Sequence, residues 1–229
     1  MSTSPSPIGA EPPERIRTTR RRGRMTDQGR SDLIELGADW AITAEALVSQ
    51  HATSEAFGIE QPLALDIGVG SGEATIMWAR NQPGLNIAAI ELHRPTMVQL
   101  LRALDNNGPP NVRLIEADAT AVVRDMAAGS VETIRLLFPD PWPKRRHVER
   151  RMVNSQFLND VANALRTGGR LEIATDWLDY AKQVRQLVAS HDCFEAGDSS
   201  TAEPRPTTAY ETRGVKAGRT ITDLVFIRR

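Results

Sequence analysis

The sequence is poor in cysteine, in clustered histidine and in long apolar runs. A single cysteine, Cys193, excludes an internal disulfide and fits a reducing, cytoplasmic setting. The four histidines, His51, His93, His147 and His191, lack the spacing of metal ligands, so we expect no metal site. There is no run of 18 apolar residues and no signal-peptide pattern, so we expect neither membrane attachment nor secretion.

Positive charge is unevenly distributed, although the formal net charge is only -1. Seven arginines fall between residues 15 and 30, and five cations fall between Lys144 and Arg151. Runs of charge are commonly no more than solvated surface. Two arginine-rich segments in an otherwise acidic chain instead favour a partner with a phosphate backbone.

The chain is long enough for one substantial core, with 229 residues and 40% apolar content. Residues 1–14 are rich in Ser and Pro, so we expect a disordered N-terminal tail. We expect residues 15–229 to form a single domain, in which a basic segment and helix within 15–60 pack on the core. That helix is predicted over 26–42. After Pro62, short β-rich runs alternate with helical stretches, which predicts a largely parallel sheet built from βαβ units.

A glycine-rich turn follows the first expected strand, residues 63–67, and leads into an expected helix over 73–81. Glycines at alternate positions let the backbone turn tightly and approach a ligand where a Cβ would collide. The strands expected over 86–91 and 112–116 also lead to acids. Because parallel strands end at the ligand-binding edge of such sheets, we expect these groups to bind a nucleotide-like ligand. The candidates are Gly68, Gly70 and Gly72 with the acids Asp66, Glu91 and Asp118.

Two classes of ligand compete for this turn. A dinucleotide such as NAD would need glycine at position 73, where the chain has Glu73. Carboxylates at Asp66 and Glu73 would also repel a pyrophosphate. A ligand that carries adenosine and positive charge but no phosphate fits better, and S-adenosylmethionine has that description.

A proline-rich segment follows the fourth expected strand, residues 131–138. Prolines on both sides of Asp140 fix φ and are expected to push each preceding residue into extended geometry, so that the carboxylate is held on a stiff turn. The basic segment begins at Lys144, directly after this turn. An acid beside a block of cations predicts that chemistry and polyanion binding meet there.

The remainder of the chain is expected to complete the sheet. A helix is predicted over 152–165, a strand over 170–175 that ends at Asp176, and a helix over 178–190. Residues 191–207 are expected to form an irregular loop. The predicted C-terminal boundary of the first of these helices is Gly168-Gly169.

Four motifs together resemble the bacterial tRNA (guanine-N7-)-methyltransferases over residues 20–229. They are Asp66-Ile-Gly-Val-Gly-Ser-Gly72, Pro139-Asp-Pro-Trp-Pro-Lys144, Ala174-Thr-Asp176, and the tail from Thr208-Ala-Tyr-Glu211 to Asp223-Leu-Val-Phe226. The glycine turn is common to many methyltransferases, whereas the proline segment and the tail are more specific. The resemblance implies a Rossmann-like class I methyltransferase fold, with a mostly parallel seven-stranded sheet and helices on both faces.

The resemblance also implies an activity: methyl transfer from S-adenosylmethionine to N7 of a guanine in tRNA, at variable-loop position 46. Asp140 would be the catalytic carboxylate and would also contact the cofactor. The family pattern implies substrate contacts for Lys144, Asp176, Thr208 and Glu211, and RNA contacts for Arg146, Arg150 and Arg151. Ala209 departs from that pattern, in which this position is often basic.

Guanine N7 carries a lone pair, so its methylation requires no proton removal and no general base. The expected tasks of the protein are therefore positioning and electrostatics. Three other functions remain open from the residues: methylation of another acceptor, such as a DNA amine or a protein, an RNA-binding subunit that has lost its cofactor, and an NAD-dependent dehydrogenase. The protein is expected to be a monomer or a homodimer that binds tRNA.

Overall fold

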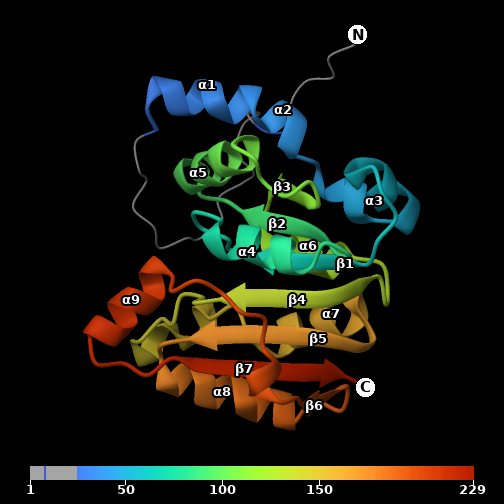
Figure 1. The fold of residues 1–229 in the computed structure, drawn as a ribbon. Coiled ribbons are helices and arrows are strands. Elements are labelled where there is room, and N and C mark those ends of the chain that lie inside the picture. Colours follow the sequence, from blue (N-terminus) through green and yellow to red (C-terminus); the bar gives the residue numbers. More distant parts are fainter. Residues whose placement is uncertain (1–7, 9–24) are drawn as a thin grey trace.

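The computed structural model describes Ile8 and residues 25–229 of the chain. Within these residues, seven strands form one sheet in the order β3-β2-β1-β4-β5-β7-β6 (Figure 1). The strands β1 to β5 are parallel, and β7 is antiparallel to both of its neighbours, β5 and β6. The strands are β1 (Leu63–Ile67), β2 (Asn86–Glu91), β3 (Val112–Glu116), β4 (Val131–Leu137), β5 (Leu165–Thr175), β6 (Phe194–Ala196) and β7 (Thr222–Arg228).

Helices cover both faces of this sheet, each over its own apolar core. One core is formed with α3, α6, α7 and α8, and the other with α1, α4 and α5. The helices are α1 (Asp27–Glu35), α2 (Gly37–Trp40), α3 (Gln50–Phe57), α4 (Glu73–Asn81), α5 (Arg94–Asp105), α6 (Ala119–Asp125), α7 (Ser155–Ala164), α8 (Leu178–Ala189) and α9 (Ala209–Lys216), with 3-10 turns η1 (Ala44–Leu47), η2 (Arg145–Arg150) and η3 (Ser199–Thr201). The predicted Rossmann-like fold is confirmed.

The strand order places a topological switch at the centre of the sheet. The chain runs outward from β1 through β2 to β3, then crosses back to add β4 on the other side of β1. Ligands in open α/β sheets bind beyond the carboxyl ends of the strands at such a point. The glycine turn after β1 and the proline segment after β4 are therefore brought together, although they lie about 70 residues apart in the sequence.

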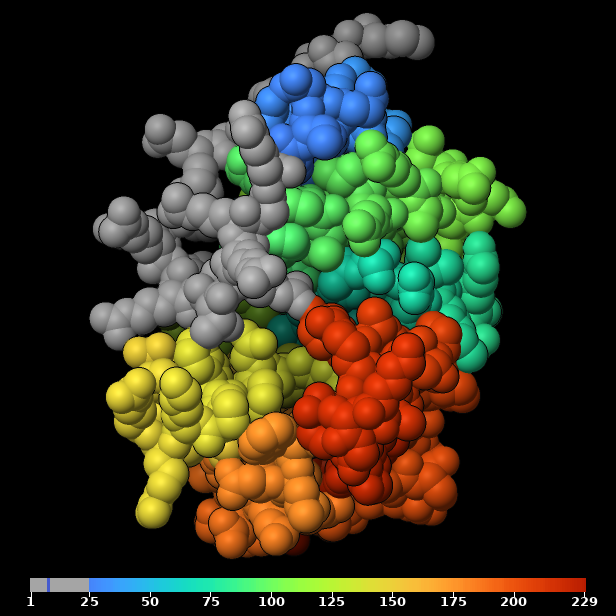
Figure 2. Space-filling view, turned by 90° about the vertical axis from the view of Figure 1, so that its left-hand side faces the viewer, coloured from blue at the N-terminus to red at the C-terminus, as the bar shows by residue number. Residues whose placement is uncertain are grey.

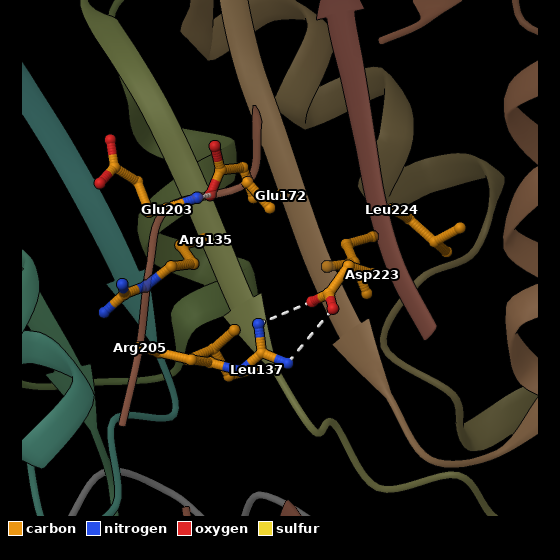
Figure 3. A pocket seen from close by; sticks show the side chains of 9 residues that line it. Arg135, Leu137, Glu172, Glu203, Arg205, Asp223 and Leu224 are labelled. Carbon is orange, nitrogen blue, oxygen red and sulfur yellow. Dashed lines mark hydrogen bonds and ion pairs between the residues drawn. The ribbon is translucent and has the colours of Figure 1, made fainter. Parts of the chain in front are cut away.

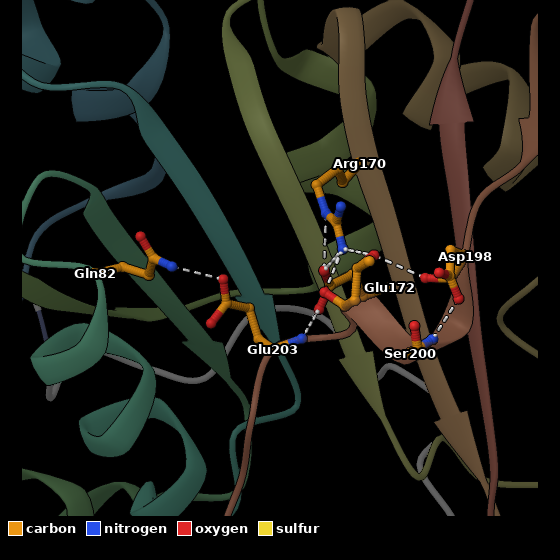
Figure 4. A network of polar contacts seen from close by, with 7 residues as sticks. Gln82, Arg170, Glu172, Asp198, Ser200 and Glu203 are labelled. Carbon is orange, nitrogen blue, oxygen red and sulfur yellow. Dashed lines mark hydrogen bonds and ion pairs between the residues drawn. The ribbon is translucent and has the colours of Figure 1, made fainter.

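On the face that carries α4, the half of the sheet formed by β4, β5 and β7 carries charged side chains beside apolar ones such as Val225. Arg135 of β4 lies in register with Asp66 of β1 on one side and with Glu172 of β5 on the other. Residues 197–208, which we call the strap, cross this charged layer. Glu203 of the strap accepts a hydrogen bond from Gln82 at 2.8 Å, and its backbone N–H donates to Glu172 at 3.1 Å (Figure 4).

Several boundaries differ from those expected. The helix predicted over 26–42 is divided at Leu36 into α1 and α2. The helix predicted from residue 152 begins at Ser155, because the Asn154 side chain caps it by accepting the N–H of Phe157 at 3.0 Å. That helix ends at Ala164, so Gly168-Gly169 is not its cap and lies in the irregular first part of β5. The expected loop 191–207 contains β6 and η3, and α6 and α9 were not expected.

Most of the N-terminal predictions lie outside the described residues. This holds for the tail over 1–14, except Ile8, and for the arginines between residues 15 and 24. The Ile8 side chain is buried in the core that contains α1, α4 and α5. Arg30, the last member of the N-terminal arginine cluster, pairs with Asp27 and donates to the Met25 carbonyl at 2.9 Å.

None of the helices described here is long and apolar enough to cross a membrane. In the same part of the chain, no group of three or more His, Cys, Asp or Glu side chains is arranged to hold a metal ion.

Candidate active site

The glycine turn after β1 depends on backbone conformations that only glycine adopts easily. Gly68, Gly70 and Gly72 have φ angles of 69°, 58° and 82°, all in the left-handed region. A Cβ on Gly68 or Gly70 would meet no atom within 4 Å, so open space lies above both residues. A Cβ on Gly72 would lie 2.3 Å from Leu100 Cδ1. Gly68 and Gly70 therefore border open space, whereas Gly72 allows α4 to pack closely against α5.

A cleft opens beside this turn, with an empty volume of about 510 Å³ that includes its mouth. Its walls are the glycine turn, the first turn of α4, the end of β4 and the start of α9. Of the predicted cofactor residues, Asp66, Gly68 and Gly70 line it, as does the predicted substrate residue Thr208. Figure 2 views the face where the parallel strands end, and shows α9 beside the segment that follows β4.

Asp66 is buried and its charge is balanced inside the protein. Arg135 donates to its two carboxylate oxygens at 2.6 and 3.2 Å, and the Thr75 hydroxyl donates at 2.8 Å. The guanidinium of Arg135 also lies over the Trp78 ring, 4.1 Å from its centroid. A buried carboxylate requires such pairing, because its desolvation is costly. Asp66 therefore shapes the cleft wall with its charge balanced by Arg135, and its contact with a ligand stays a prediction.

Glu91 holds the glycine turn from the end of β2. Its Oε2 accepts the backbone N–H of Gly70 at 3.0 Å, and its Oε1 accepts those of Leu92 and His93 at 2.8 and 2.9 Å. Asp118 has a comparable local task, since its Oδ1 accepts the N–H and the hydroxyl of Thr120 and caps α6. Both acids lie at the expected edge, and their contacts with a ligand stay a prediction.

The proline segment has a different backbone from the one expected. Phe138, which precedes Pro139, has a φ angle of 52° instead of the expected extended value, and Trp142, which precedes Pro143, also has a positive φ angle, 42°. Bulky residues in this region carry strain of about 1–3 kcal/mol each. The strain at Phe138 is offset in part by its N–H, which donates to the Ala174 carbonyl at 2.7 Å. Asp140 lies exposed between these two strained residues.

Arg151 was expected to contact RNA, and the structure contradicts this. Its side chain is only 2% exposed. It donates to the Pro141 carbonyl and to Asp179, both at 2.8 Å, and to Gln183, and it lies over the Tyr180 ring. Arg151 therefore supports the proline segment from beneath, where a phosphate could not reach it.

Lys144, Arg146 and Arg150 are exposed on and just before η2, as an RNA contact would require. Arg150 also lies over the Trp142 ring, 4.9 Å from its centroid. Desolvation, followed by the charges of Arg150, Arg146 and Lys144, lowers the pKa of His147. His147 is therefore neutral at pH 7 and adds no positive charge to the segment.

The remaining predicted substrate residues surround α9. Asp176 accepts from Arg219 at 2.8 Å and lies directly against Gly214, where a Cβ would come within 2.8 Å of the Asp176 side chain. The Thr208 hydroxyl caps α9 by accepting the Glu211 N–H at 3.1 Å. Thr-x-x-Glu is the sequence pattern of a capping box, and it could have predicted this helix.

Comparison with known proteins identifies the family. A family model described as a putative methyltransferase matches residues 60–224. A tRNA (guanine-N(7)-)-methyltransferase from Streptomyces avermitilis is 35% identical over 97% of this chain and 78% of its own length. Another with the same name, from Acidovorax sp., is 35% identical over 98% of this chain and 90% of its own. The chain belongs to the tRNA (guanine-N(7)-)-methyltransferase family.

Solved structures agree on the fold of this tRNA (guanine-N(7)-)-methyltransferase family member. The 16S rRNA methyltransferase KamB superposes with a TM-score of 0.56, at 17% identity over 79% of this chain and 94% of its own. An rRNA methylase from Streptococcus thermophilus gives a TM-score of 0.50, at 14% identity over 79% of this chain and 96% of its own. At these identities the likeness concerns the fold alone.

Sequence reasoning missed two side chains around the site of this family member, Arg135 and Arg205, and the packing of Tyr210, which belongs to the Thr208-Ala-Tyr-Glu211 motif. Arg135 neutralises Asp66, and no spacing rule connects residues on separate strands 69 positions apart. Tyr210 stacks near Phe138, with ring centroids 6.5 Å apart and planes within 11°, and both rings line the cleft. Arg205 of the strap reaches α9 and β7. These contacts depend on tertiary packing, so no local sequence pattern indicates them. The Thr-x-x-Glu capping box is a local pattern, but it indicates only the start of α9.

Proposed function

We propose that this protein transfers a methyl group from S-adenosylmethionine to N7 of guanine 46 in the variable loop of tRNA. Membership of the tRNA (guanine-N(7)-)-methyltransferase family supports the reaction class. The observation that carries the assignment of the site is the continuity of two regions. Phe138 forms part of the glycine-turn cleft, and the chain passes from it through Pro139 to the exposed Asp140.

The residues of the cleft fit S-adenosylmethionine. Open space lies above Gly68 and Gly70. A Cβ-bearing residue at either position would project into that space and could not easily adopt these φ angles. Among the described residues, the lining contains no Lys or Arg, the side chains with which a pyrophosphate is usually paired. We assign cofactor contacts to Asp66, Gly68 and Gly70 in the cleft and to Glu91, Asp118 and Asp140 along the same edge. When bound, this cofactor supplies a methyl group made electrophilic by its sulfonium.

Guanine N7 attacks with its own lone pair, so the protein supplies no base. Its task is to hold the guanine ring in line with the methyl group and to stabilise the cationic product ring. The Asp140 carboxylate is suited to both. It can accept hydrogen bonds from guanine N1–H and the exocyclic amine, a donor pair that adenine lacks, for about 1–3 kcal/mol of discrimination. Asp176 or Glu211 would provide a further acceptor from the α9 side, and Thr208 completes this group.

Exposed cations next to Asp140 supply the RNA contacts. Lys144 begins the basic segment and is assigned to the substrate near the acceptor base, while Arg146 and Arg150 contact the phosphate backbone. The target base must leave its stack to reach the cleft, as for other enzymes that modify bases.

The proposal is tested with labelled S-adenosylmethionine and unmodified tRNA. Wild-type protein should label the tRNA, and chain cleavage specific for 7-methylguanine should occur at position 46. Asp140→Asn, which preserves shape and removes the charge, should reduce the single-turnover rate by at least about 100-fold, and Asp125→Asn, a matched exposed acid outside the site, should not. Label at another atom of the base would support a different methyl transfer, and wild-type rates in Asp140→Asn would contradict the catalytic assignment.

A further inference from the structure

Arg205, in the strap that crosses the charged half of the sheet, is anchored to the last strand. Its Nη1 and Nη2 donate to the two carboxylate oxygens of Asp223 in β7, at 2.7 and 3.4 Å (Figure 3). The side chain is only 10% exposed. A bidentate contact between a planar guanidinium and a carboxylate fixes orientation as well as position. The contact with Asp223 therefore fixes both the position and the orientation of the Arg205 guanidinium.

The other side of the same guanidinium faces two elements of the candidate site. Arg205 Nε lies 3.4 Å from Oε2 of Glu211 in α9. Among the described residues, neither of these buried atoms has a hydrogen-bond partner, so their attraction is an ion pair without hydrogen-bond geometry. The guanidinium also lies over the Phe138 ring, 5.6 Å from its centroid. One side chain thus contacts β7, α9 and the residue that opens the proline segment.

We infer that Arg205 is a positioning residue that holds the Glu211 carboxylate and the proline segment in fixed relation, so that the guanine edge meets both acids at once. This inference rests on the proposed function. Arg205 stays anchored through Asp223, while its looser contact leaves Glu211 able to accept hydrogen bonds from a base. A lysine could hold Asp223 but has no fork with which to reach Glu211 and cover the Phe138 ring as well.

Arg170 offers a matched control. It tethers the same strap, donating to the Thr201 carbonyl at 2.8 Å, and it pairs with Glu172 at 2.7 Å. Among the described residues, the polar contacts of Arg170 are with Glu172 and Thr201 and include neither Glu211 nor Phe138, and Arg170 does not line the cleft. If Arg205 only secured the strap, Arg170→Met and Arg205→Met would have the same effect on guanine recognition.

The experiment compares Arg205→Met, Arg205→Lys, Glu211→Gln, the Arg205→Met/Glu211→Gln double variant and Arg170→Met, below the melting temperature of each. We expect Arg205→Met to lower kcat/KM for tRNA by about 10- to 100-fold, and Arg205→Lys to restore only a small part of this. Arg170→Met should stay within about threefold of wild type. In Glu211→Gln, the added Arg205→Met change should have little further effect, since residues that act through one another are not additive.

A second measurement on the same variants is the equilibrium affinity for unmodified tRNA without cofactor. It gives a second double-mutant cycle for Arg205→Met and Glu211→Gln. Multiplicative effects of Arg205→Met and Glu211→Gln in both readouts, or an equal loss in Arg170→Met, would overturn the inference while leaving the proposed function intact. A wild-type protein that does not methylate guanine N7 would contradict the proposed function, and the binding cycle would still decide whether Arg205 acts through Glu211.

Discussion

Two neighbouring arginines, Arg150 and Arg151, have opposite environments. Arg150 is exposed and stacked on Trp142, whereas Arg151 is buried beneath the proline segment. A run of cations in the sequence does not distinguish them. The 3-10 turn η2 ends at Arg150, and the chain then turns inward, so one side chain faces solvent and the next faces α8.

We predict that substitutions at these two residues affect different properties: Arg151 contributes to stability, and Arg150 contributes to RNA binding. Arg151→Met leaves the Pro141 carbonyl without its donor and should lower the free energy of unfolding by about 2–3 kcal/mol. Arg150→Met should change it by less than about 0.5 kcal/mol, but should weaken tRNA affinity and reduce the salt slope by about 1. Urea unfolding and fluorescence titration with tRNA measure the two effects. A stable Arg151→Met variant with weakened RNA binding would instead support an RNA contact for Arg151.

At the scale of elements, the strap replaces a helix over the charged half of the sheet. It is held by side chains of β5 and β7 and by Gln82 at the end of α4 (Figure 4). Glu203 of the strap makes two of these contacts, with Gln82 and with Glu172. Burial, then the neighbouring Glu172 carboxylate, raises the pKa of Glu203 above 4.5, opposed by the Gln82 hydrogen bond and the charges of Arg135 and Arg170.

The raised pKa predicts the direction of a pH effect on stability. Above its usual pKa of about 4.5 the unfolded chain has lost the Glu203 proton, while the folded protein still binds it. The folded state therefore binds more protons in this window, and the Glu203 contribution falls as pH rises through the folded pKa. Relative to wild type, Glu203→Gln should become progressively more stable as pH rises from 4.5 through the folded pKa of Glu203, and the difference should then level off. Urea unfolding across that range measures this, and a constant difference would contradict it.

The parallel core was predictable because its signals are local. Apolar β-rich runs such as residues 86–91 and the glycine turn at 68–72 each specify their own geometry, and the order of elements then fixes the edge where their ends meet. The strap was not predictable, because its stability comes from ion pairs such as Arg205 with Asp223, 18 residues apart on different elements. The same holds for Arg135 and Asp66 in the cleft wall.

On the scale of the whole molecule, the formal net charge of -1 does not describe how the protein meets a polyanion. The exposed cations around η2 lie beside α9 on the face where the parallel strands end (Figure 2). A local positive field there attracts a phosphate backbone even though the molecule as a whole is almost neutral.

We predict that tRNA affinity falls steeply with salt. If Lys144, Arg146 and Arg150 each neutralise one phosphate, they contribute a slope of about -2 to -3 in log K against log salt concentration. Replacing all three by Ala should remove that part of the slope and leave the unfolding midpoint nearly unchanged. Dissociation constants at a series of potassium chloride concentrations test this, and a salt-independent constant would exclude the basic segment as an RNA contact.

The position of β7 has a consequence for synthesis on the ribosome. This strand, residues 222–228, is inserted between β5 and β6, and its Asp223 anchors Arg205 beside the candidate site. The glycine turn and the proline segment emerge long before it. A nascent chain can therefore fold its parallel half early, but the α9 side of the site is completed only after residues 222–228 leave the exit tunnel. Truncated chains that end before residue 222 would lack a finished active site.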